Sequence, residues 1–279
     1  MTASNPLSIL ITGCSSGIGY MAAHELKKRG YEVIASCRHS DDVQRLIDEG
    51  LTCIQIDLAD EQSIDNGVKL ALALTDNRLN ALFNNGAYGL PGALEDLSTQ
   101  GLREQFNTNF FGWHHLTTQL IPHFRQQSYA RIVQNSSVLG FAAMKYRGAY
   151  NSSKFAIEGW TDTLRLELTD TNIRISLIEP GAIETQFRAN ALRAFKQWID
   201  IDHSVHQQEY QSQIDRLSRT HSRNKYALPA ESCLPSIIHA LEADNPKLRY
   251  RITKPTKMIA ILKRLLPGKM IDKILLKSS

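Results

Sequence analysis

A glycine-rich turn between two segments of different hydrophobic periodicity constrains the fold most strongly. Residues 7–11 form a short apolar run of strand length, and the next residues, 12–19, read TGCSSGIG. Apolar side chains then recur at helical spacing as far as Leu26. A strand, a glycine turn and a helix in this order predict the first βα unit of a dinucleotide-binding sheet, because glycine lets backbone N–H groups approach a pyrophosphate at the helix N-terminus.

The rest of the chain alternates short apolar runs with longer helical patterns. Such alternation is typical of βα units and of a parallel sheet covered by helices on both faces. We therefore predict one doubly wound Rossmann-type α/β domain, a three-layer α/β/α sandwich, over residues 1–279. The expected strands are 7–11, 31–37, 51–56, 79–84, 130–135, 173–178 and 249–253, and the expected later helices are 61–75, 98–127, 148–169 and 230–243.

A tyrosine and a lysine share one face of the predicted helix 148–169. Tyr150 and Lys154 stand at positions i and i+4, which are neighbours on a helix surface. The reference pKa of a tyrosine phenol is about 10, and a nearby ammonium favours the ionised phenol. The pair thus indicates a proton-transfer site, with the upstream Ser137 holding a substrate oxygen. The spacing alone is common in helices, and the glycine turn is what favours a hydride-transferring enzyme.

Six motifs occur in a characteristic order between residues 7 and about 190. They are Thr12-Gly13-x-x-x-Gly17-Ile18-Gly19, Asn84-Asn85-Gly86-Ala87, Asn109, Ser137, Tyr150-x-x-x-Lys154 and Pro180-Gly181. In this order and spacing the chain resembles the short-chain dehydrogenase/reductase family. The resemblance implies reversible hydride transfer between a nicotinamide cofactor and a carbonyl or alcohol. One departure is that Gly86 and Ala87 stand in swapped order relative to the usual Asn-Asn-Ala-Gly.

The resemblance also implies roles for individual residues. Asn109 corresponds to a helix-kinking asparagine whose backbone holds a water in a proton relay to Lys154, and Asp57 to the acid that fixes the adenine. The implied catalytic residues are Ser137, Tyr150, Lys154 and Asn109. The implied cofactor-binding residues are Gly13, Ser15, Ser16, Gly17, Ile18, Gly19, Arg38, Asp57, Leu58, Asn85, Gly86, Ala87, Tyr150, Lys154, Pro180, Gly181, Ile183 and Thr185.

The end of the second expected strand favours NADP(H) over NAD(H). An NAD-preferring site usually carries an acid there to accept from the ribose 2′-OH, whereas this chain has Cys37 followed by Arg38. An arginine can hold a 2′-phosphate with two charge-assisted hydrogen bonds. We therefore expect NADP(H) as the cofactor.

Residues 186–228 carry aromatic and aliphatic side chains among many polar ones, which predicts a substrate lid of one or two amphipathic helices. An apolar pocket wall favours a lipophilic aldehyde or ketone, such as a retinoid, a steroid-like ketone or a fatty aldehyde. The alternative is that these side chains only pack the lid onto the core.

Residues 247–279 form a strongly basic C-terminal extension. They contain ten Lys or Arg and one acid, Asp272, although the whole chain has a net charge of only +4. Two short amphipathic helices are expected, and the extension resembles that of bacterial NADP-dependent family members related to retinol and hydroxysteroid dehydrogenases. It could cap the substrate pocket or a subunit interface, lie on an anionic membrane surface, or bind an acidic protein. A nucleic-acid partner is disfavoured because no recognition motif accompanies the charge.

Composition argues against a membrane-spanning, secreted, disulfide-rich or metal-binding protein. No apolar run approaches the ~20 residues that span a bilayer, and the first expected strand leaves no room for a signal peptide. The four cysteines are widely spaced, so we expect no disulfide framework and no metal site. These features predict a cytoplasmic enzyme, with peripheral membrane association as the alternative. The helices 98–127 and 148–169 are the expected seam of a homodimer.

Three rival functions remain open. A 3-oxoacyl-acyl-carrier-protein reductase would use the same catalytic residues and a basic docking surface. An epimerase or dehydratase is disfavoured because those relatives generally carry a Gly-x-x-Gly-x-x-Gly turn. A non-catalytic NADP-binding sensor would not need the Ser137, Tyr150 and Lys154 set.

Overall fold

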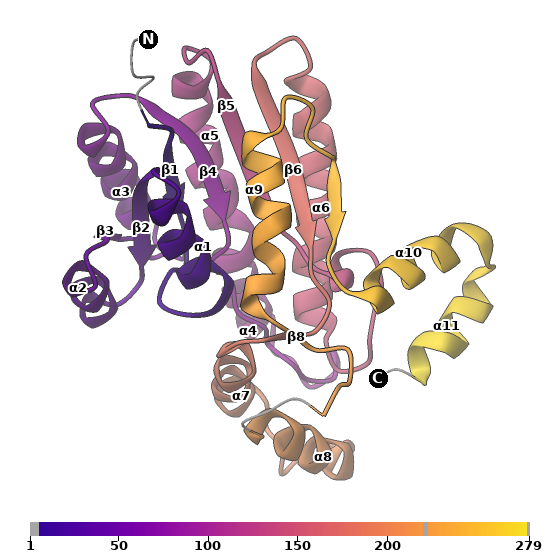
Figure 1. Cartoon of the computed structure of the whole chain (residues 1–279). Helices are drawn as coiled ribbons and strands as arrows, with labels where there is room; N and C mark the ends of the chain where they lie inside the picture. Colours follow the sequence, from indigo (N-terminus) through magenta and orange to yellow (C-terminus); the bar gives the residue numbers. More distant parts are fainter. Residues whose placement is uncertain (1–5, 220–222, 278–279) are drawn as a thin grey trace.

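A seven-stranded parallel sheet forms the centre of the molecule (Figure 1). The computed structural model describes residues 6–219 and 223–277, so residues 220–222 of the expected lid and 278–279 of the extension lie outside the described residues. The strand order is β3-β2-β1-β4-β5-β6-β9, and each neighbouring pair is parallel. The strands are β1 (Ser8–Ile11), β2 (Glu32–Cys37), β3 (Thr52–Gln55), β4 (Leu79–Asn84), β5 (Ala130–Asn135), β6 (Ile173–Glu179) and β9 (Arg249–Arg251).

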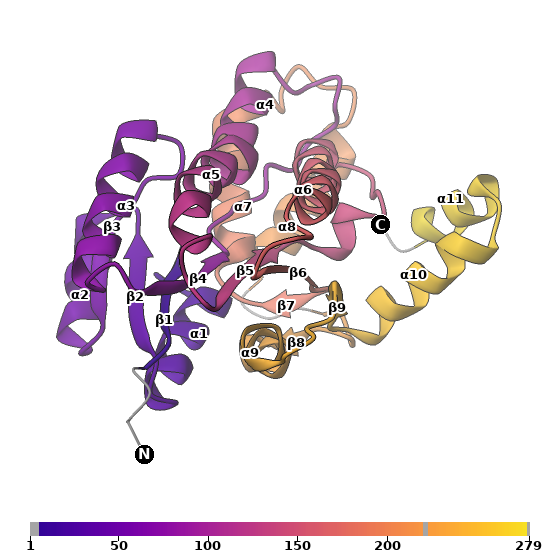
Figure 2. The same cartoon turned by 90° about the horizontal axis from the view of Figure 1, so that it is seen from above.

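Helices cover both faces of the sheet (Figure 2). One face carries α1 (Gly17–Lys28), α2 (Ser40–Asp48) and α9 (Leu234–Glu242), and the other carries α3 (Glu61–Leu74), α5 (Gly112–Phe124) and α6 (Gly148–Glu167). Because successive side chains of a strand point to opposite faces, Ile9 and Ile11 enter the first core cluster and Leu10 enters the second. The predicted three-layer, doubly wound fold is confirmed.

The expected elements agree closely with the structure, with two omissions. Helix α2 was not expected because it is short and mostly polar, with only Val43, Leu46 and Ile47 as large apolar residues. The parallel pair β7 (Ile183–Glu184) and β8 (Leu228–Pro229) was also missed. Each of these strands has two residues, which is too short for an alternating pattern.

The long helix expected over 98–127 is interrupted. It consists of α4 (Thr99–Phe106), a π-helical turn η1 (Asn107–Phe111) and α5. The N–H of Gly112 donates to the carbonyl of Asn107, which is the i to i+5 bond of a π-helix. At the same point the helix lies directly on the loop that follows β3, since a Cβ on Gly112 would be 1.9 Å from the carbonyl oxygen of Leu58.

Two helical segments are appended to the sandwich. The first, α7 (Phe187–Trp198) and α8 (Gln207–Ser218), lies beyond the carboxyl ends of the strands, and the second, α10 (Lys254–Leu265) and α11 (Gly268–Leu276), extends outward past β9 (Figure 1). Short 3-10 turns, η2 (Val138–Gly140) and η3 (Ala230–Cys233), complete the chain. None of the helices in the described residues combines the length and hydrophobicity that crossing a bilayer requires.

We expect Gly112→Ala to lower the free energy of unfolding by at least ~2 kcal/mol, because the new methyl group would collide with the backbone of Leu58. A matched control is Gly159→Ala in α6, where an added Cβ meets no atom within 4 Å. That change should instead stabilise the helix by up to about 1 kcal/mol. Urea unfolding of both variants measures the difference, and equal effects would contradict the close contact.

Candidate active site

The carboxyl ends of the central strands bring the expected cofactor segments together. Gly13 has φ +68°, and a Cβ there would lie 2.5 Å from the Cα of Gly86, which follows β4. Gly17 has φ +62°, and a Cβ there would lie 2.9 Å from the side chain of Thr185, which follows β7. Both positions therefore need glycine, for conformation and for space. The order of the strands reverses between β1 and β4, and a doubly wound sheet binds ligands at such a crevice.

A set of hydrogen bonds joins the glycine turn to the segment after β4. The hydroxyl of Thr12 accepts from the backbone N–H groups of Asn85 and Gly86, both at 2.9 Å. The side-chain amide of Asn85 donates to the carbonyls of Thr12 at 3.0 Å and Gly13 at 3.2 Å. The swapped order of Gly86 and Ala87 therefore coexists with close packing of the two segments.

Asn135, which the sequence did not single out, connects this network to Lys154. Its side-chain amide donates to Oδ1 of Asn85 at 2.9 Å, and its carbonyl accepts from Nζ of Lys154 at 2.7 Å. A signal for this residue existed, because Asn135 ends β5 two positions before Ser137. The carboxyl ends of parallel strands meet at one edge, where polar residues gather around a ligand.

Lys154 is buried at the centre of the site. Its side chain is 1% exposed, and its Nζ lies 4.2 Å from the centroid of the Trp113 ring. Burial lowers the pKa of Lys154 to about 7, and the negative charge of Glu158 acts in the opposite direction. The ammonium is therefore held by a carbonyl and an indole face, and its charge is only marginally stable near neutral pH.

Tyr150 and Ser137 lie together beside this lysine. Burial raises the pKa of the Tyr150 phenol to about 12, and a hydrogen bond with Ser137 opposes the rise. The Nζ of Lys154 is 5.7 Å from the Tyr150 ring centroid. The sequence led us to expect a lowered phenol pKa, but in the chain alone desolvation raises the pKa of Tyr150 by more than the hydrogen bond with Ser137 lowers it. The phenol therefore keeps its proton at neutral pH.

Asn109 lies in the π-helical turn and is fully buried. Its side chain forms two bonds with the backbone of Tyr88, accepting from the N–H at 3.2 Å and donating to the carbonyl at 2.9 Å. It also donates to the hydroxyl of Ser153 at 3.3 Å. Asn109 thus ties the loop after β4 to helix α6, the helix that carries Tyr150 and Lys154.

A cleft of about 550 Å³ opens beside the glycine turn. Ser15, Ser16, Gly17 and Thr185 line it, and so do Arg45 and Arg188. Arg45 donates to the carbonyl of Ser15 at 2.8 Å and forms ion pairs with Asp42 of its own helix and with Glu49, which follows the helix. The sequence did not assign Arg45 because helix α2, which carries it, was not expected.

The remaining expected cofactor residues occupy the same edge of the sheet. Arg38 follows β2, is exposed, and contacts the ring of His39. Asp57 follows β3 and accepts from the N–H of Ala59 at 2.9 Å. Leu58 packs on Gly86, and Gly19 lies against the carbonyl of Gly13. Ile18 and Ile183 pack on the first core cluster, and Ala87 packs on the second. The carbonyl of Pro180 accepts from the N–H of Val138 at 2.8 Å, and Gly181 packs on Thr253.

Among residues 6–219 and 223–277, no group of three or more His, Cys, Asp or Glu is arranged to hold a metal ion. The four cysteines are free and buried.

Comparison with known proteins agrees with this geometry. The short chain dehydrogenase family model matches residues 8–195. The uncharacterized oxidoreductase YbbO of Escherichia coli (strain K12) is 41% identical over 269 residues, which cover 96% of this chain and 93% of that protein. Human retinol dehydrogenase 8 is 35% identical over 201 residues, covering 68% of this chain and 63% of that protein.

A solved structure confirms the fold. A short chain dehydrogenase/reductase from Burkholderia phymatum in complex with NAD has a TM-score of 0.78 at 22% identity and covers 94% of both chains. The parallel sheet and the family match define an oxidoreductase. The chain belongs to the short-chain dehydrogenase/reductase family.

The pKa of Lys154 gives a prediction on stability. The pKa is about 7 in the folded chain and has a model-compound value of 10.5, so between these values the unfolded chain binds more protons. The contribution of Lys154 to the free energy of unfolding therefore increases as the pH rises through this window. Lys154→Met should remove that increase, as measured by urea unfolding across the window.

The control for this measurement is Lys69→Met, since Lys69 is an exposed lysine of α3. Its variant should keep the pH dependence of the native chain. Identical slopes for Lys154→Met and the native protein would show that Lys154 keeps an ordinary pKa.

Proposed function

We propose that this protein is an NADP(H)-dependent reductase of lipophilic aldehydes or ketones. The observation that carries the proposal is the half-buried Tyr150 phenol, which shares a hydrogen bond with Ser137 and lies beside Lys154. A phenol that retains its proton at neutral pH suits a general acid, which a carbonyl reduction needs.

The residues present fit a bound dinucleotide. The glycine turn lies at the N-terminus of α1, the position that favours a pyrophosphate. Oδ1 of Asn135 is buried without a hydrogen-bond partner among the described residues, which supports a polar ligand group at this point. The expected cofactor-binding residues named above would hold the dinucleotide, and its nicotinamide supplies the hydride.

Each catalytic residue then has a distinct task. The Ser137 hydroxyl donates to the carbonyl oxygen of the substrate, and Tyr150 gives its proton to the same oxygen as negative charge develops there. Lys154 stabilises the phenolate that remains. Asn109 fixes the loop after β4, and its backbone in the π-helical turn belongs to the relay that returns a proton to Tyr150.

Of the two arginines near the cofactor edge, Arg38 supports a preference for NADP(H). Arg38 stands where an acid would select NAD(H), and its charge suits a 2′-phosphate. Arg45, the neighbour of the glycine turn, is already paired with Asp42 and Glu49, so Arg38 is the better candidate for phosphate selection. The Burkholderia relative was solved with NAD, so family membership alone does not choose between the two cofactors.

The substrate class follows from the apolar groups around Tyr150. The ring of Phe187, the first residue of α7, lies 5.3 Å from the Tyr150 ring. Leu90 and Trp198 contribute to an apolar cluster under the same helix. This lining, together with the similarity to a retinol dehydrogenase, favours a retinoid, a steroid-like ketone or a fatty aldehyde. A 3-oxoacyl-acyl-carrier-protein substrate and a non-catalytic sensor role are the competing proposals.

Quaternary structure and location belong to the same proposal. The outer surface near α5 and α6 exposes Phe111 and Leu166, at 52% and 70%, which suits a homodimer seam. Four free, buried cysteines suit a reducing compartment such as the cytoplasm.

Tyr150→Phe should remove nearly all NADPH-dependent turnover of a lipophilic aldehyde while leaving NADPH affinity close to that of the native enzyme. The physical reason is that phenylalanine keeps the ring and removes the proton donor. Initial rates and a fluorescence titration of NADPH measure the two effects. The control is Tyr31→Phe, at a tyrosine that precedes β2 and so lies at the opposite end of the sheet from the site. The native protein could instead bind NADPH but reduce no retinoid aldehyde, steroid ketone, fatty aldehyde or acetoacetyl thioester. That result would favour the non-catalytic sensor role over the reductase.

Arg38→Asp should reverse the charge that meets the 2′-phosphate. We expect the ratio of kcat/KM for NADPH to that for NADH to fall on the order of 10- to 100-fold, the size of one lost charge-assisted hydrogen bond. Lys69→Asp, far from the site on α3, should leave the ratio unchanged. An unaltered ratio in the Arg38 variant would remove Arg38 from cofactor selection.

A further inference from the structure

The C-terminal extension has two different helix faces. Helix α10 packs on the body through Ile259 and Ala260, which are 7% and 6% exposed, and Nζ of Lys263 donates to the carbonyl of Phe141. Beyond this attachment, α10 and α11 extend away from the sheet (Figures 1 and 2). One face of α10 is therefore held in place, and the opposite face is left in solvent.

That opposite face carries an apolar stripe. Met258, Ile261 and Leu265 are 53%, 58% and 73% exposed. Their i, i+3, i+7 spacing places them along one side of α10. Met270 and Leu276 of α11 are also exposed, at 50% and 58%. Scattered exposed apolar residues are ordinary on a protein surface, but an aligned set on an extended element marks an interaction site.

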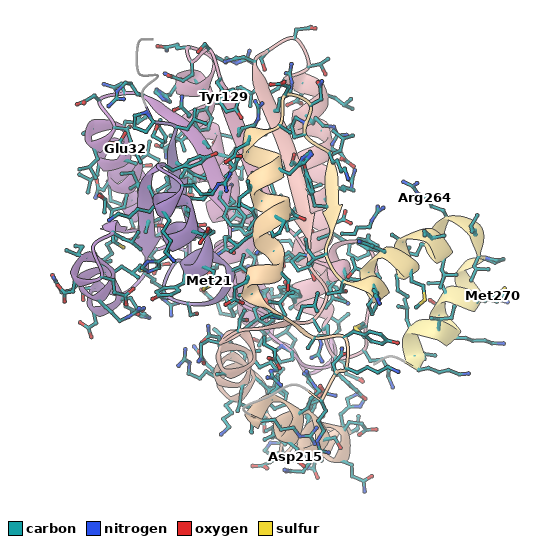
Figure 3. All side chains as sticks on the ribbon, in the orientation of Figure 1. Met21, Glu32, Tyr129, Asp215, Arg264 and Met270 are labelled. Atoms are coloured by element: carbon teal, nitrogen blue, oxygen red, sulfur yellow. The ribbon has the colours of Figure 1, made fainter. Side chains whose placement is uncertain are left out.

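Basic side chains surround the stripe. Figure 3 shows Met270 at the outer edge of the extension, whereas Arg264 lines a cleft between α10 and the body together with Phe141. Asp272 is the single acid in residues 247–279. Apart from Lys263, which is bonded to the body, the exposed basic residues of the two helices are Lys254, Lys257, Arg264, Lys269 and Lys273, and Lys277 follows α11.

We propose that the α10–α11 extension docks the protein on an anionic lipid bilayer, with the stripe of Met258, Ile261 and Leu265 entering the interface. An apolar helix face with basic flanks binds such a surface, because the acyl chains bury the apolar side chains while the anionic headgroups attract the basic ones. A second copy of this chain fits less well, because a two-fold contact would place the same basic extension against itself. The proposal does not depend on the reaction proposed above.

Sedimentation of the full chain with lipid vesicles tests the proposal. The protein should partition onto vesicles of phosphatidylcholine mixed with phosphatidylglycerol, much less onto phosphatidylcholine alone, and less as salt is raised. Ile261→Asp should weaken the partition at least about tenfold, since it removes the central apolar contact. Val205→Asp, at an 83% exposed valine between α7 and α8, is the matched control and should bind as the native chain does.

The charge contribution is tested separately. Lys257→Glu should weaken the partition about fivefold or more, in line with the effect of one basic residue near an anionic surface. Lys69→Glu, an equal change on α3, should leave it unaltered. Leu265→Gln repeats the test of the stripe in case Ile261→Asp does not fold, and thermal unfolding with NADPH binding verifies the fold of each variant.

Three outcomes would overturn the proposal. One is no preference for phosphatidylglycerol vesicles, and another is equal partition of the native and stripe variants. The third is a fall in molecular mass on Ile261→Asp, measured by ultracentrifugation without lipid, together with unchanged lipid partition. That result would assign the stripe to a contact between copies of the chain.

Discussion

The burial of the Lys154 side chain is the constraint on which the site depends. An ammonium removed from water must be hydrogen-bonded or it destabilises the fold by several kcal/mol. Here its partners are the carbonyl of Asn135, at 2.7 Å, and the face of Trp113, at 4.2 Å. Asn135 in turn holds Asn85, and Asn85 holds Thr12. One polar network therefore fixes helix α6 and the ends of β1, β4 and β5 relative to one another.

The same burial affects the two titrating groups in opposite directions. It raises the pKa of Tyr150 to about 12 and lowers that of Lys154 to about 7, because a water-poor site disfavours the charged form of either group. The protein alone thus favours a protonated phenol and a lysine close to its neutral form. In the proposed reaction, the negative charge that develops on Tyr150 as it gives up its proton would favour the charged form of Lys154.

The two appended segments differ in how they meet the core. In the first, Phe187 of α7 packs on Tyr150, and Phe195 packs on Tyr210 of α8 with ring centroids 5.1 Å apart. Apolar side chains of this segment are largely used within the molecule. The second segment, α10 and α11, buries Ile259, Ala260 and Ile271 but leaves Ile261 and Leu265 in solvent. This difference is consistent with the two proposed roles, a substrate lid for the first segment and a docking surface for the second.

Local pattern in the sequence determined the sheet, the glycine turn and the helical pairing of Tyr150 with Lys154. Strand alternation and helical spacing are properties of near neighbours, and the family's motif order placed Asn109 at the interruption that the structure shows as a π-helical turn. Only the tertiary structure decided the rest. It made Asn135 the link to Lys154, placed Arg45 beside the glycine turn, set the direction of the Tyr150 pKa and left one face of α10 uncovered. Each of these features depends on which residues distant in the sequence lie nearby in the fold, and no local pattern encodes that.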